Sequence, residues 1–342
     1  RMKTHTAFDK ILNSYPFDGS FKEIITFIDG LSGYEKYVFD LFPKNTGFLR
    51  FDRENGGSYI SVKPFKGEVN SSGKIESGLD KLRIANQPIT IEFSLCIPSG
   101  SNNDNEVIIQ RLANSRTGIT IAASSSKPGE YAQDGLSVFP LHINISSASH
   151  GSTLKVDLPK GVFNNVGVVY DRGGTNTVKV YNNGNIILKS NPFLVGDFKF
   201  GSKNLNIGSG SLHQTPDGIF KPAQTLSGAL DELRVFKKSK TDKQVVENYQ
   251  KQIFAEKDLI YYNRFNEPSG SFDLVSNNKS LVLDHSGQSL HAKVVNFDIS
   301  LRNNLDYPKA LLAENPNHSP VLFPSYTELN NLATDLILSA SD

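Results

Sequence analysis

Tryptophan is missing from the sequence, and cysteine and methionine occur once each. Because there is a single cysteine, Cys96, no disulfide can form within the chain. Cys96 lies in the apolar run ITIEFSLCIP, which predicts a buried free thiol rather than a nucleophile or a metal ligand. The single methionine, Met2, is preceded by Arg1, so we expect the chain to be a fragment or a processed product.

Excess charge and long apolar runs are also missing. The 342 residues include 36 basic and 35 acidic side chains, and the net charge of +1 provides no basic field for nucleic acid. The longest apolar runs, such as VGVVY at residues 166–170, fall far short of the roughly 18 residues that a membrane-spanning helix needs. We therefore expect neither a nucleic-acid partner nor membrane insertion. The hydrophobic fraction of 38% is nevertheless sufficient for a substantial core.

The first 44 residues have helical character. Ser20 is a suitable N-cap for the segment SFKEIITFIDG, whose apolar residues fall on one helical stripe and which ends at Gly30. The next segment, GYEKYVFDLFP, predicts a second short helix that ends at Pro43. We therefore predict a helical N-terminal segment over residues 1–44.

From Gly47 onward the sequence consists of short β-rich segments separated by clusters of Gly, Asn, Ser and Asp. This spacing, with almost no helical periodicity, is typical of an antiparallel β-sandwich or barrel. We predict an all-β fold, an antiparallel β-sandwich of the jelly-roll type. The eleven expected strand segments are GFLRFD, SYISVKPF, PITIEFSLCI, EVIIQRL, GITIAA, GLSVFPLHINIS, STLKVDL, NNVGVVYD, NTVKVYNNGNIIL, KNLNIGS and GALDELRVF.

Two of these stretches give more detailed predictions. In NTVKVYNNGNIIL, the pair Asn183-Gly184 can adopt positive φ at both central positions of a tight hairpin turn. In SGALDELRVFKKSKTDKQVVENY, a strand pattern changes to helical spacing, with Ser239 or Thr241 as the N-cap of a short helix. The apolar residues of that helix are Val245, Val246 and Tyr249.

A series of motifs along residues 45–255 resembles the laminin-G-like domains of the concanavalin-A-like lectin and glucanase fold. The motifs are FLRFDRENGGSYISV, ITIEFSL, NNVGVVYD, VKVYNNGNIIL, LNIGSGS and SGALDELRVFKKSKTDKQVVENY, in this order. The resemblance implies a lectin-like sandwich over residues 45–255. The family usually carries tryptophan at two places where this chain has Phe93 and Phe163, which argues against a tryptophan platform for sugars.

Residues 256–342 carry two further resemblances. The segments DLIYYNRFNEPSGSF and LVLDHSGQSLHAKVVNF are similar to the entry of another domain of the same type. They predict an added hairpin or a lone element derived from a repeat, packed on the sandwich. The segment NPNHSPVLFPSYTELNNLATDLILSAS resembles part of large tailed-bacteriophage virion proteins that carry a laminin-G-like insertion. Its three prolines predict an extended arm, and the amphipathic helix that follows is suited to docking on an assembly partner.

The adjacent acids Asp231 and Glu232 raise the alternative of a glycoside hydrolase, because the fold family includes such enzymes. Successive strand residues point to opposite faces, so we expect that the two carboxylates cannot share one substrate site. The sequence also shows no phosphate loop, dinucleotide fingerprint, metalloprotease motif or nucleophile elbow. We therefore predict a protein without catalytic residues.

Calcium is the cofactor that the resemblance suggests. Related domains often hold this ion at a sandwich edge through carboxylate, carboxamide and carbonyl oxygens. Each candidate aspartate also fits a simpler role, in which its carboxylate accepts hydrogen bonds from backbone N–H groups of a turn, and we favour that interpretation. The calcium candidates are Asp52, Asp171, Asp231 and Asp284.

Glycan binding has candidate residues of two kinds. Tyrosines could provide stacking faces, and the asparagine-rich loops at residues 102–105 and 182–185 could donate hydrogen bonds to sugar hydroxyls. The favoured alternative is that the tyrosines fill the sandwich and the asparagines form turns. The tyrosines concerned are Tyr59, Tyr131, Tyr170, Tyr181, Tyr261 and Tyr262.

Together with the resemblance, these features predict a non-enzymatic structural protein of a phage virion, in its tail, baseplate, fibre or decoration. The lectin-like sandwich would be displayed for assembly or for attachment to the host surface. Its partners would be other virion proteins, copies of itself and a cell-surface glycan. The alternative is a bacterial glycan-binding module that is secreted or attached to the cell surface.

Overall fold

The computed structural model describes residues 48–53, 56–64, 80–99, 104–124, 137–249, 253, 255–265, 280–288, 290–298 and 301. The two expected N-terminal helices, Tyr131 and the expected arm and helix beyond residue 301 lie outside these residues. No helix among the described residues is long and apolar enough to cross a membrane.

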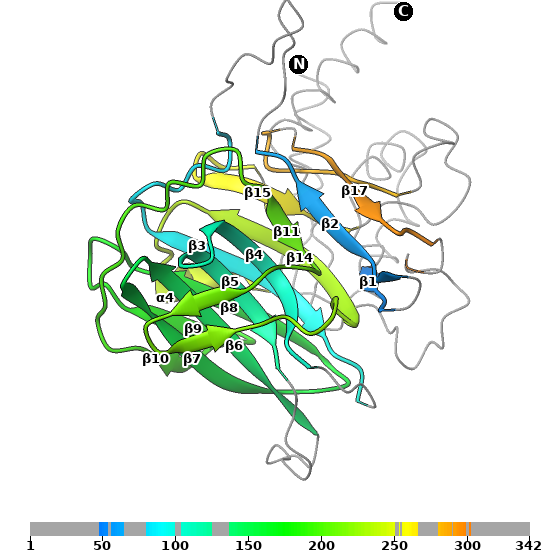
Figure 1. Ribbon diagram of the computed structural model, residues 1–342, viewed down its shortest axis with the longest axis horizontal. Coiled ribbons are helices and arrows are strands. Elements are labelled where there is room, and N and C mark those ends of the chain that lie inside the picture. Colours follow the sequence, from blue (N-terminus) through cyan, green and yellow to red (C-terminus); the bar gives the residue numbers. More distant parts are fainter. Residues whose placement is uncertain are drawn as a thin grey trace, which may run out of the picture.

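The larger part of the described chain forms two antiparallel sheets (Figure 1). One sheet has seven strands, with the spatial order β1 (Leu49–Phe51), β14 (Gly228–Phe236), β3 (Ile89–Cys96), β8 (Phe163–Tyr170), β9 (Val178–Asn182) and β10 (Asn185–Lys189), and with β15 (Leu259–Asn263) also paired to β14. The other has eight strands, in the order β16 (Leu281–Val282), β17 (Ala292–Val295), β2 (Tyr59–Val62), β11 (Leu205–Ile207), β4 (Glu106–Asn114), β5 (Thr117–Ala123), β6 (Val138–Ser147) and β7 (His150–Pro159).

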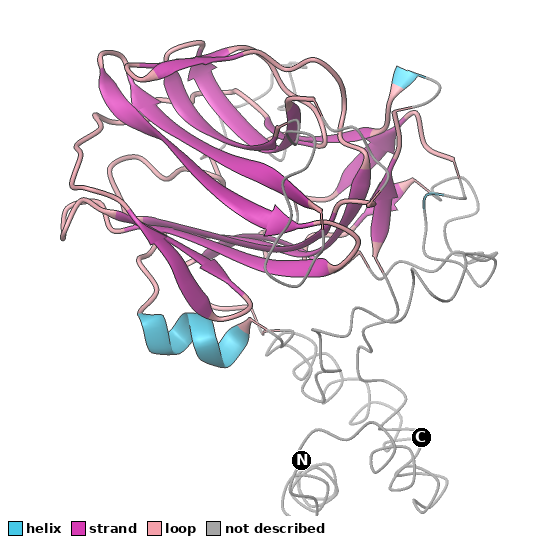
Figure 2. Cartoon of the chain, turned by 90° about the horizontal axis from the view of Figure 1, so that it is seen from below, coloured by secondary structure: helices cyan, strands magenta, loops and turns pink. Residues whose placement is uncertain are grey.

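The two sheets stack face to face around one continuous hydrophobic core (Figure 2). Alternation along the strands decides which side chains enter this core, because successive residues of a strand point to opposite faces. On β9, for example, Val178 and Val180 are buried in the core, whereas Lys179 lies on the outer face of the seven-stranded sheet. The predicted all-β antiparallel sandwich is confirmed, and each of the eleven expected segments contains a strand.

Both outer faces of the sandwich are partly covered. The helix α4 (Asp242–Asn248) lies outside the seven-stranded sheet, where Val245 packs against Val169 and Tyr181 (Figure 2). A hairpin of β12 (His213–Thr215) and β13 (Gly218–Phe220) lies on the outer face of the eight-stranded sheet, across β5, β6 and β7. Helix α4, together with Phe48, which packs on Cys96 and Phe163, covers the outer face of β3 and β8, and both strands are buried along their whole length.

The detailed local predictions are largely confirmed. Asn183 and Gly184 have φ angles of 49° and 78°, and form the two-residue turn between β9 and β10. Thr241, rather than Ser239, is the N-cap of α4. Of the expected apolar helix residues, Val245 is buried but Val246 is 49% exposed, because α4 is short and only one of its faces contacts the sheet.

Cys96 is a buried free cysteine, as predicted. It packs with Phe48, Phe163 and Ala229 in a small cluster outside the main core. Burial raises the pKa of the Cys96 thiol to about 11, so the thiolate needed for nucleophilic attack is suppressed.

The chain after residue 255 is built into both sheets. β15 pairs with β14 at one side of the molecule, and β17 pairs with β2 in the opposite sheet. These pairings lie close to the ends of the sheets that β1 and β2 occupy (Figure 1). A domain boundary at residue 255 stays a prediction.

Candidate functional site

The acidic pair Asp231 and Glu232 lies at a β-bulge in β14. Leu230 and Leu233 both enter the core, so the two acids between them share the outer face of the sheet. The register with β3 shifts between Asp231 and Arg234, and Glu232 adopts a φ of 52°. The expectation that strand alternation separates these carboxylates is therefore wrong, because the extra residue of the bulge brings Glu232 onto the face of Asp231.

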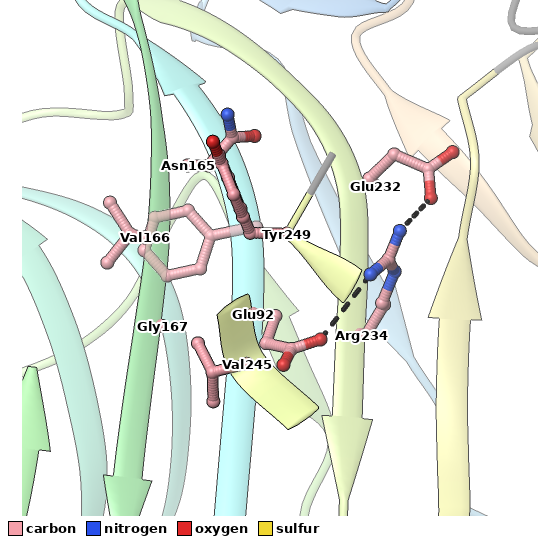
Figure 3. A pocket seen from close by; sticks show the side chains of 9 residues that line it. Glu92, Asn165, Val166, Gly167, Glu232, Arg234, Val245 and Tyr249 are labelled. Atoms are coloured by element: carbon pink, nitrogen blue, oxygen red, sulfur yellow. Dashed lines mark hydrogen bonds and ion pairs between the residues drawn. The ribbon is translucent and has the colours of Figure 1, made fainter. Parts of the chain in front are cut away.

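Glu232 belongs to a buried cluster of charges on this face (Figure 3). Its Oε2 accepts hydrogen bonds from Arg234 Nη2 at 2.7 Å and from the Tyr262 hydroxyl. Arg234 Nη1 lies 3.4 Å from Glu92 Oε2, and Lys240 Nζ donates to both oxygens of Glu92 at 2.9 Å. Two carboxylates thus face two cations in a region that water does not reach, where each charge depends on its partners.

This charge cluster fixes helix α4 on the sheet. Arg234 Nη1 donates a 3.1 Å hydrogen bond to the carbonyl of Asn248, the last residue of the helix. At the other end, the Thr241 hydroxyl accepts from the Gln244 N–H, and the Gln244 side chain accepts from the Thr241 N–H. The void beneath the helix is only about 10 Å³, so we regard the cluster as packed structure rather than as a ligand site.

A groove of about 510 Å³ opens beside the cluster, on the same outer face. Val169 of β8 and Lys179 of β9 belong to its lining, together with the turn at residues 171–177 and the segment 239–243 that leads into α4. Hydroxyl groups and charges predominate among the other lining residues. These are Asp171, Thr175, Thr177, Lys189, Ser239, Lys240, Thr241, Asp242 and Lys243.

The groove has an excess of positive charge. Its lining contains four lysines and two aspartates, a balance of 4 − 2 = +2. Asp242 accepts hydrogen bonds from Lys179 Nζ and from the Tyr181 hydroxyl, and these donors lower the pKa of its carboxyl group. Lys240 is turned toward buried Glu92; burial lowers its pKa, and the attraction of Glu92 opposes that effect.

The turn at residues 171–177, which lines part of the groove, is organised by Asp171, one of the predicted calcium ligands. Its Oδ2 accepts hydrogen bonds from the Thr175 N–H at 2.8 Å and from the Thr175 hydroxyl at 2.9 Å. The backbone hydrogen bond from Thr175 is the main cause of the lowered pKa of Asp171, with a further contribution from the Ser239 side chain. Asp171 therefore holds the turn that forms one rim of the groove.

The other calcium candidates lie elsewhere in the fold. Asp52 follows β1, 3.5 Å from an Arg50 nitrogen, and Asp231 is buried opposite Ser94 of β3. Asp284 accepts hydrogen bonds from three backbone N–H groups, at 2.9–3.0 Å, and from the Ser286 hydroxyl at 2.9 Å. Within the described ranges, no group of three or more His, Cys, Asp or Glu side chains is arranged to hold a metal ion. Calcium binding at these aspartates stays a prediction.

Four of the tyrosines considered for sugar stacking are buried. Tyr170, Tyr181, Tyr261 and Tyr262 are each at most 1% exposed, so their rings pack inside the protein. Tyr59 is partly exposed on β2. The groove accordingly relies on hydroxyl and charged groups rather than on exposed aromatic rings.

The sequence gives a misleading signal for the groove lysines. If the strands were paired residue by residue from a two-residue turn at Asn183-Gly184, Lys179 would lie opposite Leu188. Lys189 would then point to the core side of the sheet. A bulge between Ile186 and Leu188 shifts the register, so Lys189 becomes the partner of Lys179. The alternation of Val178, Lys179 and Val180 could have revealed an outward lysine, but not its partner.

Comparison with known proteins identifies the family. A laminin-G-type family model, described as the concanavalin A-like lectin/glucanases superfamily, matches residues 69–246, more than half of the chain. The chain belongs to this superfamily. Its sandwich is thus a lectin-like domain, as the resemblance implied. No curated protein sequence matches the chain.

Several solved structures are similar to this lectin-like domain. A candidate carbohydrate binding protein from Bacteroides ovatus is 17% identical, with a TM-score of 0.45, and the match covers 74% of this chain and 58% of that one. The heptameric SAP-like pentraxin from Limulus polyphemus is 16% identical, with a TM-score of 0.39, and the match covers 59% and 81% of the two chains. The CBM40 of the Ruminococcus gnavus IT-sialidase, solved with α2,3 sialyllactose, is 14% identical, with a TM-score of 0.32 and coverage of 56% and 96%. The chain thus spans little more than half the length of the Bacteroides ovatus protein.

Proposed function

We propose that the chain is a non-enzymatic binding module whose lectin-like sandwich attaches to a glycan. The observation that carries this proposal is the groove of about 510 Å³ on the outer face of the seven-stranded sheet. Its hydroxyl, ammonium and carboxylate groups are the donors and acceptors that sugar hydroxyls require. Because strands and a capped helix hold these groups, they are positioned before a ligand arrives. Membership of a lectin and glucanase superfamily supports the same function.

A glycan array screened with the full chain, with and without calcium, tests this proposal. We expect binding to a restricted set of glycans. A gain of binding on addition of calcium would support the predicted role of the aspartates, and equal binding in both conditions would remove that role. An array without any bound glycan would contradict the proposed function.

We propose a module without catalysis because the two buried glutamates beside the groove are already held in ion pairs and hydrogen bonds. Glu92 accepts from Arg234 and Lys240, and Glu232 accepts from Arg234 and Tyr262. A general acid or nucleophile of a glycosidase has to reach the scissile bond, and these ion pairs keep both groups inside the protein. Incubation with the glycans bound on the array should release no reducing sugar. Turnover that is lost on replacing Glu92 by Gln would contradict this part of the proposal.

We further propose that the module is part of a phage virion, in the tail, baseplate, fibre or decoration. The support is the resemblance of residues 315–341 to a segment of tailed-phage virion proteins, and the proposal includes the division into residues 1–44, 45–255 and 256–342. Partners would be other virion proteins or further copies of the chain. A structure of the intact assembly should show residues 300–342 buried against another chain, and a free segment would contradict this role.

The alternative is a secreted or cell-surface bacterial module that uses the same groove. The surroundings of the gene distinguish the two. Neighbouring genes for other virion proteins would favour the phage, and a signal peptide encoded upstream of Arg1 would favour the bacterial module.

A further inference from the structure

Two lysines face each other across the hairpin of β9 and β10, on the groove side of the sheet. Lys179 and Lys189 are direct register partners, which places their Cβ atoms about 5 Å apart. Like charges directly opposite one another destabilise a sheet. The arrangement depends on the bulge between Ile186 and Leu188, since an unbroken ladder would place Leu188 opposite Lys179.

Among the described residues, the positive charge of Lys179 is neutralised by an acidic side chain, whereas that of Lys189 is not. Lys179 Nζ donates to Asp242, and the same carboxylate oxygen accepts from the Tyr181 hydroxyl at 2.6 Å. Lys189 is exposed, and its ammonium group forms no hydrogen bond or salt bridge with any residue in the part of the chain that the structure describes. Its attraction to Asp242 is a weaker effect, last among the causes of that carboxyl's lowered pKa.

The remaining groups of the groove leave this positive charge open to a ligand. The second acid, Asp171, accepts hydrogen bonds from the N–H and the hydroxyl of Thr175. Lys243, in the first turn of α4, has an 81% exposed side chain and only a loose 3.6 Å pair with Glu247. A concave surface with two exposed ammonium groups attracts anions, and it does so more strongly than the same charges on a flat surface.

We propose that the groove binds an acidic glycan, with Lys189 as the cation that anchors its carboxylate or sulfate group. The proposal rests on the proposed glycan-binding function and specifies the ligand class of that site. An anionic oxygen group placed between Lys189 and Lys243 would relieve the repulsion between Lys179 and Lys189. The Thr241 hydroxyl accepts from the Gln244 N–H, and its own proton stays available to a sugar oxygen.

The experiment compares matched pairs of glycans on the full chain, by calorimetry at low and at physiological salt. One pair is sialyllactose and lactose, and a second pair is a sulfated oligosaccharide and its desulfated form. We expect the acidic member of at least one pair to bind more tightly, with affinity that falls as salt rises. The pair that shows the difference tells whether the anchored group is a carboxylate or a sulfate.

The variant Lys189→Gln separates a binding role from a structural one. It should weaken binding of the acidic glycan by about tenfold or more, because a charge-assisted hydrogen bond is lost. The same variant should keep or slightly raise the melting temperature, because it removes a cross-strand repulsion. Lys155→Gln, which replaces an exposed strand lysine on the other sheet, is the matched control and should change neither property.

The outcomes separate this inference from the proposed function. Equal binding of acidic and neutral glycans, or full affinity in Lys189→Gln, would overturn the acidic specificity while leaving glycan binding intact. Failure of every glycan to bind would overturn both.

Discussion

Arg234 is the residue on which the buried charge cluster depends. Its guanidinium group contacts Glu92, Glu232 and the carbonyl of Asn248, and it lies 5.3 Å from the Tyr262 ring centre. Removing one member of a buried ion pair is costly because the partner remains charged and dehydrated. The cluster therefore stabilises the contact between β14 and α4 only while all of its members are present.

We predict that Arg234→Met destabilises the protein by about 3–5 kcal/mol, because two buried carboxylates lose their main partner. Urea unfolding measures this change. Lys238→Met is the control, since Lys238 pairs with partly exposed Glu256 at 3.0 Å, and it should cost less than about 1 kcal/mol. Equal losses of unfolding free energy in both variants would show that the buried cluster stabilises the protein no more than an exposed ion pair does.

His213 forms a second buried network, under the β12–β13 hairpin. Gln110 donates to Thr120 Oγ1 at 2.9 Å, and the Thr120 hydroxyl lies 2.9 Å from His213 Nδ1. On the other side, His213 Nε2 lies 2.7 Å from Ser146 Oγ, which donates to the Arg116 carbonyl. The neutral ring with its proton on Nε2 satisfies all of these groups, and burial lowers the pKa of His213 to about 4.

This network predicts that stability depends on pH. The ordinary pKa of histidine is about 6.5, so between pH 6.5 and 4 the unfolded chain binds a proton that the native state excludes. The contribution of His213 to stability should be complete above pH 6.5 and fall by up to about 3 kcal/mol as the pH decreases to 4. Burial lowers the pKa of His142 to about 4 as well, so the parent should lose more than this contribution alone. Urea unfolding at several pH values should show a smaller slope for His213→Gln than for the parent. An unchanged slope in His213→Gln would contradict the assignment.

The β9–β10 hairpin is the element that places the groove lysines. Gly184 has a φ of 78°, and a Cβ atom there would lie 3.0 Å from the Tyr249 ring. We predict that Gly184→Ala costs about 1–2 kcal/mol, because an L-residue is strained in this conformation. Thermal unfolding measures the loss. Gly218→Ala is the control, since that position has open space around it, and an equal loss there would point to a general effect of removing glycine.

Strands are the elements that the sequence predicts well, and bulges are those it predicts badly. A run such as ITIEFSLC has the composition and length of a strand in any context, whereas a bulge depends on how two strands pair. The bulge at Glu232 reversed the expected face of one acid, and the bulge before Leu188 set the face of Lys189. The hairpin of β12 and β13 escaped prediction because its three-residue strands, HQT and GIF, are too short to show a period.

At the scale of the whole molecule, the groove joins three stretches that are distant in sequence. These are residues 169–179, residue 189 on the edge strand β10, and residues 239–243. The family and the sandwich could be predicted, because ordered motifs carry them. The groove could not be predicted from the sequence, because only the packing of α4 on the sheet brings its lining residues together. Of the four predicted calcium aspartates, it contains only Asp171.

The most direct test of the account is a crystal structure of the full chain with an acidic glycan selected by the array. The account predicts the sugar in the groove beside α4, with its anionic group within hydrogen-bonding distance of Lys189 Nζ. A glycan bound on the outer face of the eight-stranded sheet, or at the loops around Asp52 or Asp284, would contradict it.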